Sequence, residues 1–558
     1  MGNDLEIRRS LGKTWYAFFG RFGSRLTEVQ RVAIPEVLTG SNLVLCAPTA
    51  SGKTEAILAP VVQRLLDSGL GEGVQLLYIT PTRALASDLL ERIQGPLERV
   101  GWRAGIWTSD RKANLKTPPQ IIVTTPEGFD SLLSRHTEDL VGLKVVVLDE
   151  LHMIDGGYRG DQLRILLERL RLVLDRPVWT CILSATLADP NAVAARYMDE
   201  FRIVTIRGDR PIAWRVLSSV GRPVPDEAFD LLRKARARKI LVFCNTRNDV
   251  ELVASDIDRG FLKDRVLVHH GLIGREERLS VEEAFKDWPV AACVATSTLE
   301  VGIDIGDVDV VVLYGCPPSV ASLLQRIGRG NRRTGEIFAV GISLSAAETE
   351  QFTFLFNLGA SGTLQTREYA PKLGDAIQQI FSYLVQRRSI GTRKSHLVRM
   401  LRPFELVEED VDGILASLVA EEWVEIDSYG RILPARRLEK EIEYGKMHSN
   451  IPDTGSWTVV DEAGLEIGFA TEIAPVFLIG GKAREVVRID YRWQKVYVKT
   501  VRARKADLVL SGGVASDQGK YYHLLPERLH EKSGSPFEVR KRRRALDSAD
   551  PSLVRHED

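Results

Sequence analysis

Between about residues 43 and 343, short runs of β-branched and other apolar residues alternate with longer amphipathic segments. Short runs that are apolar almost throughout are typical of strands buried on both faces of a parallel sheet. One intervening segment, 163–174, repeats leucine at the spacing of a helix face. This alternation predicts a doubly wound α/β fold. We expect strands at 43–46, 76–79, 121–124, 145–148, 181–183, 240–243, 266–268, 293–295, 308–313 and 338–342.

The alternation occurs twice, with a break near 207–214 that predicts a linker between two α/β lobes. Beyond the lobes, amphipathic helices are expected at 375–386 and 408–420 and a hairpin at 423–432, an order typical of a winged-helix domain. Period-two alternation then predicts a small β-rich domain. The expected domains are lobe 1 over 1–210, lobe 2 over 211–364, the winged helix over 365–438, the β-rich domain over 439–530 and a basic tail over 531–558.

Composition narrows the class of protein. The 558 residues include 75 Lys and Arg and 75 Asp and Glu, so the chain is not expected to coat polyanions indiscriminately, although a local basic groove stays open. No apolar stretch approaches the ~20 residues of a membrane helix, and the N-terminus has no apolar signal core. Five cysteines stand singly, which argues against a zinc site or a disulfide framework. We therefore expect a cytoplasmic protein without a membrane partner.

The first predicted strand runs directly into the sequence APTASGKT, a Walker A loop in which Ala47 replaces the first glycine. Such a turn directs backbone N–H groups and a helix N-terminus at phosphates, here around Ser51 and Gly52. Lys53 is expected to reach the β- and γ-phosphates, and the Thr54 hydroxyl to bind Mg²⁺. The expected ligands are therefore ATP and Mg²⁺.

The strand at 145–148 ends in two adjacent acids, which is a Walker B arrangement. Asp149 is expected to hold Mg²⁺ through its water shell, and Glu150 to orient or deprotonate the attacking water. A solvated acid pair at a strand end is the alternative, but the nearby Walker A loop favours the catalytic interpretation.

The second lobe contains the sequence QRIGRGNR, which we expect to be helical. Arg329 and Arg332 would then share one helix face. If that face lines the cleft between the lobes, both guanidinium groups could act as arginine fingers on the γ-phosphate. A solvated basic face is the alternative that the residues leave open.

In order and spacing, these motifs resemble those of superfamily 2 helicases of the DEAD/DEAH type, whose two lobes are RecA-like. The resemblance also rests on LTEVQ, PTRAL, TPE, SAT, NTR, HG and TSTLEVGID at 26–30, 81–85, 125–127, 184–186, 245–247, 270–271 and 296–304. It implies that Gln30 reads adenine and that Asp304 faces ATP. Strand-end hydroxyl and arginine side chains can donate to backbone phosphates without reading sequence.

The resemblance assigns the remaining motif residues to two groups. The expected nucleic-acid contacts are Thr82, Arg83, Thr125, Glu127, Asn245, Thr246, Arg247, His270 and Thr296, with Trp423 of the winged helix. The expected coupling residues are His152, Ser184, Thr186, Gly302 and Gln325. For Trp423, stacking on a base and burial in the domain core are both open.

Three further segments resemble the core form of the large helicase-related (Lhr) family, namely DELH, LEVGIDIGDVDVVV and HSNIPD. This resemblance implies a 3′–5′ translocase on single-stranded DNA that unwinds DNA or RNA–DNA duplexes, with a role and a partner in DNA repair. It also implies a monomer. Motif VI, QRIGRGNR, has Gly330-Asn331 where the family more often has Ala-Gly, a change that leaves both arginines usable. The chain is shorter than core members, so the resemblance implies ATPase activity more firmly than unwinding. An RNA helicase that opens duplexes locally and an ATP-gated clamp are the alternatives.

The β-rich segment adds a candidate nucleic-acid surface. Residues 482–505 contain nine Lys or Arg against two acids, interleaved with Tyr491, Trp493 and Tyr497. Basic residues beside aromatic rings are typical of single-strand binders. A sheet with one charged, solvated face would show the same pattern.

Overall fold

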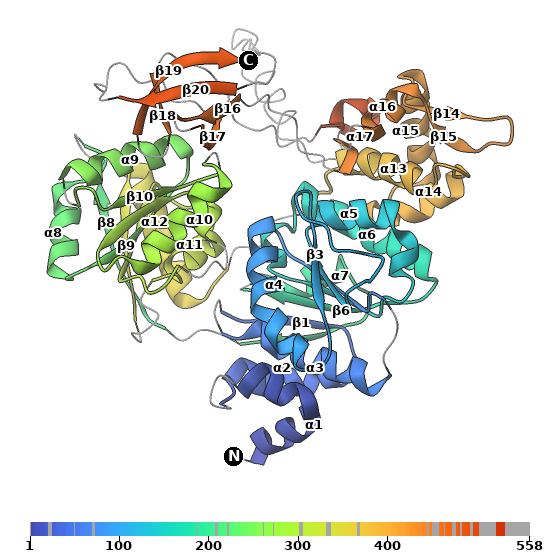
Figure 1. Ribbon diagram of the computed structural model, residues 1–558, viewed down its shortest axis with the longest axis horizontal. Helices are drawn as coiled ribbons and strands as arrows, with labels where there is room; N and C mark the ends of the chain where they lie inside the picture. The colour runs from blue at the N-terminus through green and yellow to red at the C-terminus, as the bar shows by residue number, and fades with distance from the viewer. Residues whose placement is uncertain are drawn as a thin grey trace, which may run out of the picture.

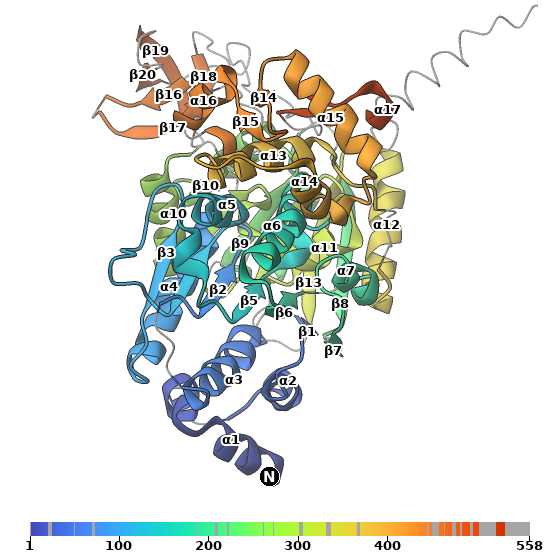
Figure 2. The same ribbon diagram turned by 90° about the vertical axis from the view of Figure 1, so that its right-hand side faces the viewer.

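The computed structural model describes most of the chain. The described residues are 2–20, 25–48, 51–69, 73–185, 187–206, 210–219, 222–260, 262–271, 273–300, 305–330, 336–364, 369–443, 446–448, 457–462, 464–470, 476–479, 482–490, 495–501 and 520–530. Two α/β lobes lie side by side, with a mostly helical domain on the first and a small sheet on the second (Figures 1 and 2). None of the helices in these residues combines the length and hydropathy that crossing a bilayer requires.

Lobe 1 is built on a seven-stranded parallel sheet of order β3-β4-β2-β5-β6-β1-β7. Its strands are β1 (Leu43–Cys46), β2 (Leu76–Ile79), β3 (Ala104–Trp107), β4 (Ile121–Thr124), β5 (Val145–Leu148), β6 (Trp179–Ser184) and β7 (Arg202–Thr205). Its helices are α1 (Gly2–Phe19), α2 (Glu28–Leu38), α3 (Lys53–Asp67), α4 (Arg83–Glu98), α5 (Pro126–Arg135), α6 (Tyr158–Leu174) and α7 (Pro190–Ala195).

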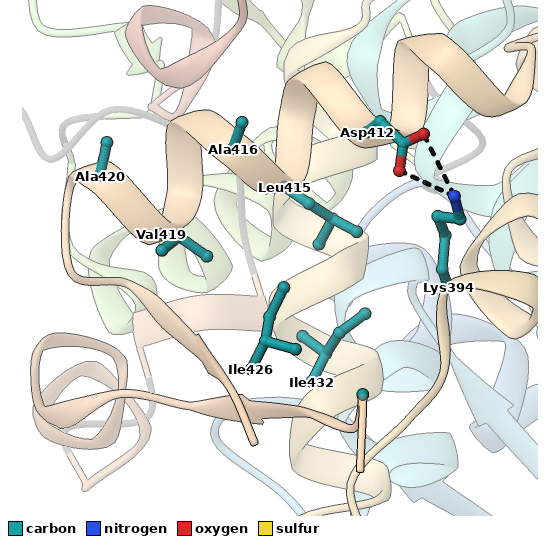
Figure 3. A pocket seen from close by; sticks show the side chains of 9 residues that line it. Lys394, Asp412, Leu415, Ala416, Val419, Ala420, Ile426 and Ile432 are labelled. Carbon is teal, nitrogen blue, oxygen red and sulfur yellow. Dashed lines mark hydrogen bonds and ion pairs between the residues drawn. The ribbon is translucent and has the colours of Figure 1, made fainter. Parts of the chain in front are cut away.

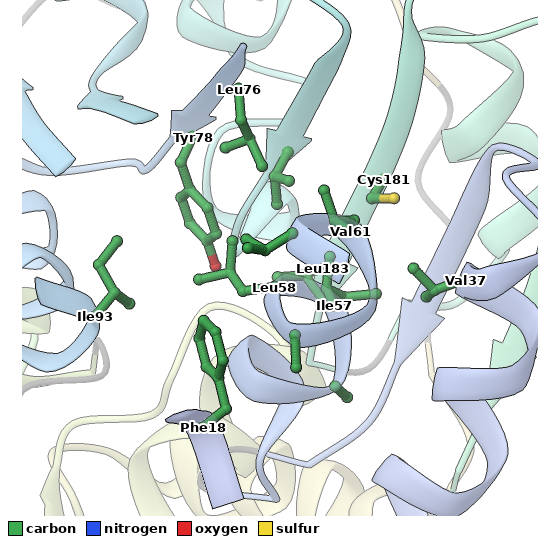
Figure 4. Packing of buried hydrophobic residues seen from close by; sticks show 14 of the residues in the cluster. Phe18, Val37, Ile57, Leu58, Val61, Leu76, Tyr78, Ile93, Cys181 and Leu183 are labelled. Carbon is green, nitrogen blue, oxygen red and sulfur yellow. The ribbon is translucent and has the colours of Figure 1, made fainter. Parts of the chain in front are cut away.

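Buried side chains on both faces of this sheet explain why its strands are apolar without alternation. On one face, residues of α1 to α4 pack on the sheet; Phe18, Leu58 and Tyr78 meet there (Figure 4). On the other face, residues of α5, α6 and α7 form a second buried cluster. Burial of both faces is the expected reason for such runs.

Lobe 2 repeats the architecture with a six-stranded parallel sheet of order β10-β11-β9-β12-β13-β8. Its strands are β8 (Ile212–Ser218), β9 (Lys239–Cys244), β10 (Val266–His269), β11 (Ala291–Ala295), β12 (Val310–Tyr314) and β13 (Ile337–Ser343). Its helices are α8 (Asp226–Lys234), α9 (Arg247–Gly260), α10 (Arg275–Asp287), α11 (Val320–Ile327) and α12 (Ala346–Ser361).

The third domain has the helices and hairpin of a winged helix and packs on lobe 1. It consists of α13 (Gly374–Gln386), α14 (Lys394–Met400), α15 (Glu408–Ala420), the antiparallel pair β14 (Val424–Ile426) and β15 (Ile432–Pro434), and α16 (Arg436–Glu443). Its apolar cluster also takes in Ile165 of α6 and residues from the end of the chain, including those of α17 (Glu527–His530).

A small mixed sheet of order β17-β16-β20-β19-β18 completes the described chain. Its strands are β16 (Trp457–Val460), β17 (Glu466–Ala470), β18 (Val476–Ile479), β19 (Lys482–Asp490) and β20 (Lys495–Thr500). It touches lobe 2 through a hydrogen bond from the Gly274 amide to the Ile467 carbonyl, 3.1 Å long.

Every strand expected in the lobes is present, and the helices expected at 375–386 and 408–420 are α13 and α15. Three differences have physical reasons. Three of the eight residues of the expected linker, 212–214, begin β8, an edge strand that is only partly buried and therefore lacks the apolar signature. Some apolar residues expected in the β-rich domain pack instead in the core of the winged helix, including Ile442, Met447, Tyr521, Leu524 and Leu529. The helix expected across QRIGRGNR ends at Ile327 with Gly328 as its C-cap.

Candidate nucleotide and nucleic-acid site

The motif residues of lobe 1 meet because they follow neighbouring parallel strands, whose carboxyl ends share one edge of the sheet. The Walker A loop follows β1, SAT includes the end of β6, and the acid pair follows β5; these three strands are adjacent. PTRAL and TPE follow β2 and β4 at the same edge. The sheet order therefore separates the nucleotide motifs from the expected nucleic-acid motifs along one rim.

The Walker A turn is held by its own lysine and by the segment before it. The Lys53 ammonium is buried and donates to the carbonyls of Ala47 (2.9 Å) and Pro48 (3.2 Å). Gly52 has φ of +86°, and a Cβ there would lie 2.4 Å from Nε2 of Gln30. Only glycine fits this position.

Gln30 is a support of the same turn. Its side chain accepts from the Thr27 amide in a capping box that starts α2, and its Nε2 lies 3.4 Å from the Gly52 carbonyl. The Thr27 hydroxyl donates to the carbonyl of Ser51 at 2.9 Å. The start of α2 is therefore tied to the phosphate loop, with Gln30 beside that loop. The expected contact of Gln30 with adenine stays a prediction.

The two acids after β5 are both buried and differ in pKa. Burial and the charge of Glu150 raise the pKa of Asp149 to about 7, against the opposing effects of Lys53 and Tyr78. Burial also acts to raise the pKa of Glu150, but the charges of Lys53, His152 and Arg329 lower it overall. Glu150 has φ of +45°, a conformation that is uncommon outside glycine and that clusters at functional sites.

These residues fit a divalent cation of the Mg²⁺ type. Asp149 and Thr54 supply a carboxylate and a hydroxyl, the oxygen ligands that Mg²⁺ prefers. A cation would offset the repulsion that raises the pKa of Asp149. Among the described residues, Oε2 of Glu150 is buried without a hydrogen-bond partner, as suits a group that binds a water of the reaction.

His152 joins the acid pair to the SAT segment at the end of β6. Its Nδ1 lies 2.9 Å from the Ser184 hydroxyl, 3.5 Å from Oε2 of Glu150, and accepts from the Ala185 amide at 3.3 Å. Burial and Lys53 lower the pKa of His152, while Glu150 opposes them. A neutral ring that accepts at Nδ1 carries its proton on Nε2. The expected coupling residues His152 and Ser184 are thus in contact.

Arg329 is a buried residue of lobe 2 whose charge acts on the acid pair of lobe 1. The residue is 2% exposed, its Nη2 donates to the Glu300 carbonyl at 2.6 Å, and its charge is one of those that lower the pKa of Glu150. It follows α11 rather than lying on it. Gln325, on α11, is half-buried.

The lobe 1 residues expected at nucleic acid are largely helix caps. The hydroxyls of Thr82 and Thr125 accept from the third amide of α4 and of α5, at 3.3 Å each. Arg83 is exposed and lies 3.1 Å from the Ser109 hydroxyl. Glu127 accepts two hydrogen bonds from Arg159, of 2.6 and 3.0 Å. Burial acts to raise the pKa of Glu127, but Arg159 lowers it overall.

The lobe 2 residues of this group include two whose polar atoms already have partners. The Asn245 amide donates to the Cys316 carbonyl and accepts from Arg326, at 2.8 and 2.9 Å. The Thr246 hydroxyl donates to Asp249 at 2.7 Å and caps α9. Arg247 is exposed and Thr296 is half-buried, so these two remain open to a strand.

Two expected contacts are buried in this structure. The His270 ring is 2% exposed and lies 2.8 Å from Glu251, so it has no surface to present to a strand. Trp423 stacks on Phe381 with ring centroids 5.0 Å apart and meets Tyr521 edge-on. Its ring belongs to the winged-helix core, which is the second of the two alternatives, because the hairpin folds it inward.

Other expected residues lie outside the described part of the chain. They are Thr186, Gly302, Asp304 and Arg332 of the motifs, and Tyr491 and Trp493 of the β-rich segment.

Sequence patterns missed two sets of residues at the site. Tyr78 of β2 donates to Oδ2 of Asp149 at 2.9 Å; the only signal was one hydroxyl in an aliphatic strand. Arg326 of QRIGRGNR links this segment to NTR through Asn245 and to TSTLEVGID through Glu300, the latter at 2.6 Å. That link depends on the spatial order of β9, β11 and β12, which no short pattern contains.

A separate groove of about 530 Å³ opens on the winged helix, far from the nucleotide motifs in the fold. It lies between α15 and the β14–β15 hairpin and is mostly apolar, with Leu415, Val419, Ile426 and Ile432 pointing into it (Figure 3). The Lys394–Asp412 ion pair closes one end. It offers no group for nucleotide chemistry.

Two family models match the lobes. The DEAD/DEAH box helicase model matches residues 27–194, and the helicase conserved C-terminal domain model matches residues 224–334.

The similar proteins are helicases of the Lhr type. The ATP-dependent helicase Lhr-Core of Methanocaldococcus jannaschii is 33% identical over 60% of this chain and 43% of the relative. The Lhr-Core of Saccharolobus solfataricus is 29% identical over 90% of this chain and 64% of the relative. The chain thus spans less than two thirds of either relative.

A solved structure with a similar fold is the Mycobacterium smegmatis helicase Lhr bound to ssDNA and AMP-PNP. It matches 80% of this chain and 64% of that chain, with a TM-score of 0.68 and 26% identity. Together with the order of the motifs along the sheet edges, these matches show that the two lobes match the DEAD/DEAH box helicase and helicase C-terminal models and that the chain is similar to the Lhr-Core proteins.

Proposed function

We propose that this chain is an ATP-dependent helicase or translocase that moves 3′ to 5′ on single-stranded DNA and unwinds DNA or RNA–DNA duplexes. The observation that carries the proposal is that the charge of Arg329 in lobe 2 acts on Glu150 in lobe 1, because this links groups from two lobes to one reaction centre. The ssDNA in the similar Mycobacterium smegmatis structure supports the choice of substrate. A role in DNA repair, a repair-protein partner and a monomeric state belong to the same proposal.

In the proposed reaction, Lys53 and the Walker A amides hold the phosphates of ATP. Glu150, with an ionised carboxylate, orients the attacking water and accepts its proton. Arg329 offsets the charge that develops on the γ-phosphoryl group. Bound Mg²⁺, held by Thr54 and Asp149, would neutralise part of the negative charge of the phosphates.

Motion follows from where these groups reside. Glu150 and Arg329 belong to different lobes, so a nucleotide between them favours the closed arrangement, and loss of the γ-phosphate weakens it. His152 and Ser184 connect Glu150 to the end of β6 and so to the rim that carries PTRAL and TPE. Nucleotide state and grip on a strand are thereby linked.

ATP turnover and strand displacement test the proposal together. ATP hydrolysis is measured without nucleic acid and with single-stranded DNA, single-stranded RNA and a hybrid, all at one salt concentration. Displacement is measured on hybrid forks that carry either a 3′ or a 5′ single-stranded tail. The proposal predicts DNA-stimulated turnover and displacement from the 3′-tailed fork only.

The alternatives give different outcomes in the same assays. Stimulation by RNA alone, with displacement of short duplexes regardless of tail, would identify a locally acting RNA helicase. Turnover without any displaced strand would identify an ATP-gated clamp.

A further inference from the structure

Tyr78 is a buried tyrosine in direct contact with Asp149, one of the proposed Mg²⁺ ligands. It lies on β2 opposite Val147 of β5, two residues before Asp149, on the same face of the sheet. Its ring packs among apolar residues, with Leu58 beside it (Figure 4). The surroundings explain the ring but not the hydroxyl, which a phenylalanine would lack at no cost in packing.

The hydroxyl of Tyr78 has a polar partner in the nucleotide site. It donates to Oδ2 of Asp149 at 2.9 Å. The bond joins the neighbouring strands β2 and β5 at the point where the Walker B acids begin.

This hydrogen bond has a consequence for ligation. Tyr78 holds Oδ2 of Asp149, while Oδ1 stays available to a cation apart from one hydrogen bond from the Glu150 amide at 2.9 Å. With Oδ2 held, the carboxylate is fixed in one orientation.

We propose that Tyr78 is a positioning residue that orients Asp149 for the divalent cation bound with ATP. The inference rests on the proposed function, since it deepens the account of that nucleotide site. Tyr78 acts through the carboxylate of Asp149 and not by direct contact with the cation or the nucleotide.

The test is the Mg²⁺ dependence of nucleotide binding, with AMP-PNP as the probe. Binding is followed by thermal shift and by calorimetry, across a Mg²⁺ titration and in EDTA. Tyr78→Phe should raise the half-saturating Mg²⁺ concentration about tenfold, the effect of losing one hydrogen bond to a charged group. Affinity for AMP-PNP in EDTA should stay unchanged, because Lys53 and the loop amides are intact.

A matched control exists in the same lobe. Tyr197 is also buried and donates to Asp155 at 2.9 Å, away from the nucleotide motifs. Tyr197→Phe removes the same kind of bond and should lower thermal stability without changing the Mg²⁺ dependence. Equal Mg²⁺ dependence in Tyr78→Phe and Tyr197→Phe would overturn the proposal.

A double-mutant cycle tests whether Tyr78 acts through Asp149. If it does, Asp149→Asn combined with Tyr78→Phe should raise the half-saturating Mg²⁺ concentration little more than Asp149→Asn alone. Additive losses would refute the positioning role. A wild-type protein without Mg²⁺-dependent AMP-PNP binding would instead contradict the proposed function, so the two failures are distinguishable.

Discussion

At the scale of single residues, Asp149 and Glu150 are adjacent and both buried. Bound Mg²⁺ and nucleotide are proposed to offset the unfavourable free energy of holding these two carboxylates together. The raised pKa of Asp149, about 7 against 3.8 in the unfolded chain, means that the folded protein holds a proton that the unfolded chain releases above pH 3.8. This carboxyl therefore reduces stability progressively as pH rises from about 4 to 7.

Asp149→Asn should remove this pH-dependent loss of stability. In nucleotide-free protein, the variant is expected to melt above wild type at pH 8, by ~2–4 °C for each kcal/mol recovered. The difference should shrink as pH falls through 7 toward 5. Thermal melts over this range provide the measurement, and parallel pH profiles for the two proteins would contradict the assignment.

Glu150 is expected to act on the attacking water. Glu150→Gln keeps the size of the side chain but cannot accept a proton, so kcat for ATP should fall about 10²- to 10⁴-fold. Single-strand binding should stay near wild type. Glu168→Gln is the control, since its side chain is also 14% exposed but lies on α6 and pairs with Arg171. Lys53→Ala should likewise abolish turnover.

Arg329 is expected to act on the transition state more than on bound ATP. Arg329→Ala should lower kcat about 10³-fold with a much smaller change in KM. Steady-state kinetics with saturating single-stranded DNA separate the two constants, and Arg388→Ala on the surface of the winged helix serves as control. A variant that loses only affinity would show that this guanidinium does not stabilise the transition state.

At the scale of elements, the most buried polar contact joins α5 and α6 to the winged helix. Arg169 of α6 and Asp130 of α5 form a 2.7 Å ion pair with both side chains 0% exposed. Gln379 and Gln386 of α13 accept from Arg169 at 2.9 and 2.8 Å. Burial acts to raise the pKa of Asp130, but hydrogen bonding from His448 and the charge of Arg169 lower it overall.

Removal of one partner from this pair leaves a buried charge. Arg169→Met should cost about 3–5 kcal/mol of unfolding free energy. Urea unfolding followed by tryptophan fluorescence reports on it, because Trp423 lies in the same domain core. Arg388→Met breaks the exposed pair with Glu439 and should cost about 1 kcal/mol or less. Equal losses of unfolding free energy in Arg169→Met and Arg388→Met would mean that the buried network stabilises the fold no more than an exposed ion pair.

At the scale of the whole molecule, the contacts divide the chain into two halves. The winged helix shares an apolar cluster and the Asp130–Arg169 network with lobe 1. The small sheet contacts lobe 2 through Gly274 and Ile467 (Figure 1). We therefore expect ATP-driven closure to move lobe 2 relative to a unit formed by lobe 1 and the winged helix.

Fluorescent labels can follow this motion. The exposed residues Val141 of lobe 1, Tyr429 of the winged helix and Leu279 of lobe 2 accept cysteine labels. Cys316, the half-buried native cysteine, is first replaced by serine; the other four are buried. Addition of AMP-PNP and single-stranded DNA should change energy transfer between 141 and 279 but not between 141 and 429. A change in the second pair would show that the winged helix moves independently.

Much of the fold could be predicted from the sequence because strands buried on both faces need unbroken apolar runs. Partly buried strands, such as β8, carry no such pattern and were missed. The helix boundary after Ile327 was also missed, although Gly328 and Gly330 flank Arg329 and glycine is a signal for the end of a helix.

The sequence by itself determined the identity and order of the nucleotide motifs, since short loops such as APTASGKT act through local backbone geometry and adjacent residues. Tertiary structure alone decided which side chains meet across strands and lobes. Tyr78 reaches Asp149, the charge of Arg329 acts on Glu150, and His448 returns to Asp130 only after distant segments pack. The same packing buries His270 and Trp423. Exposure and long-range hydrogen bonding depend on the complete arrangement of elements, and no local pattern encodes them.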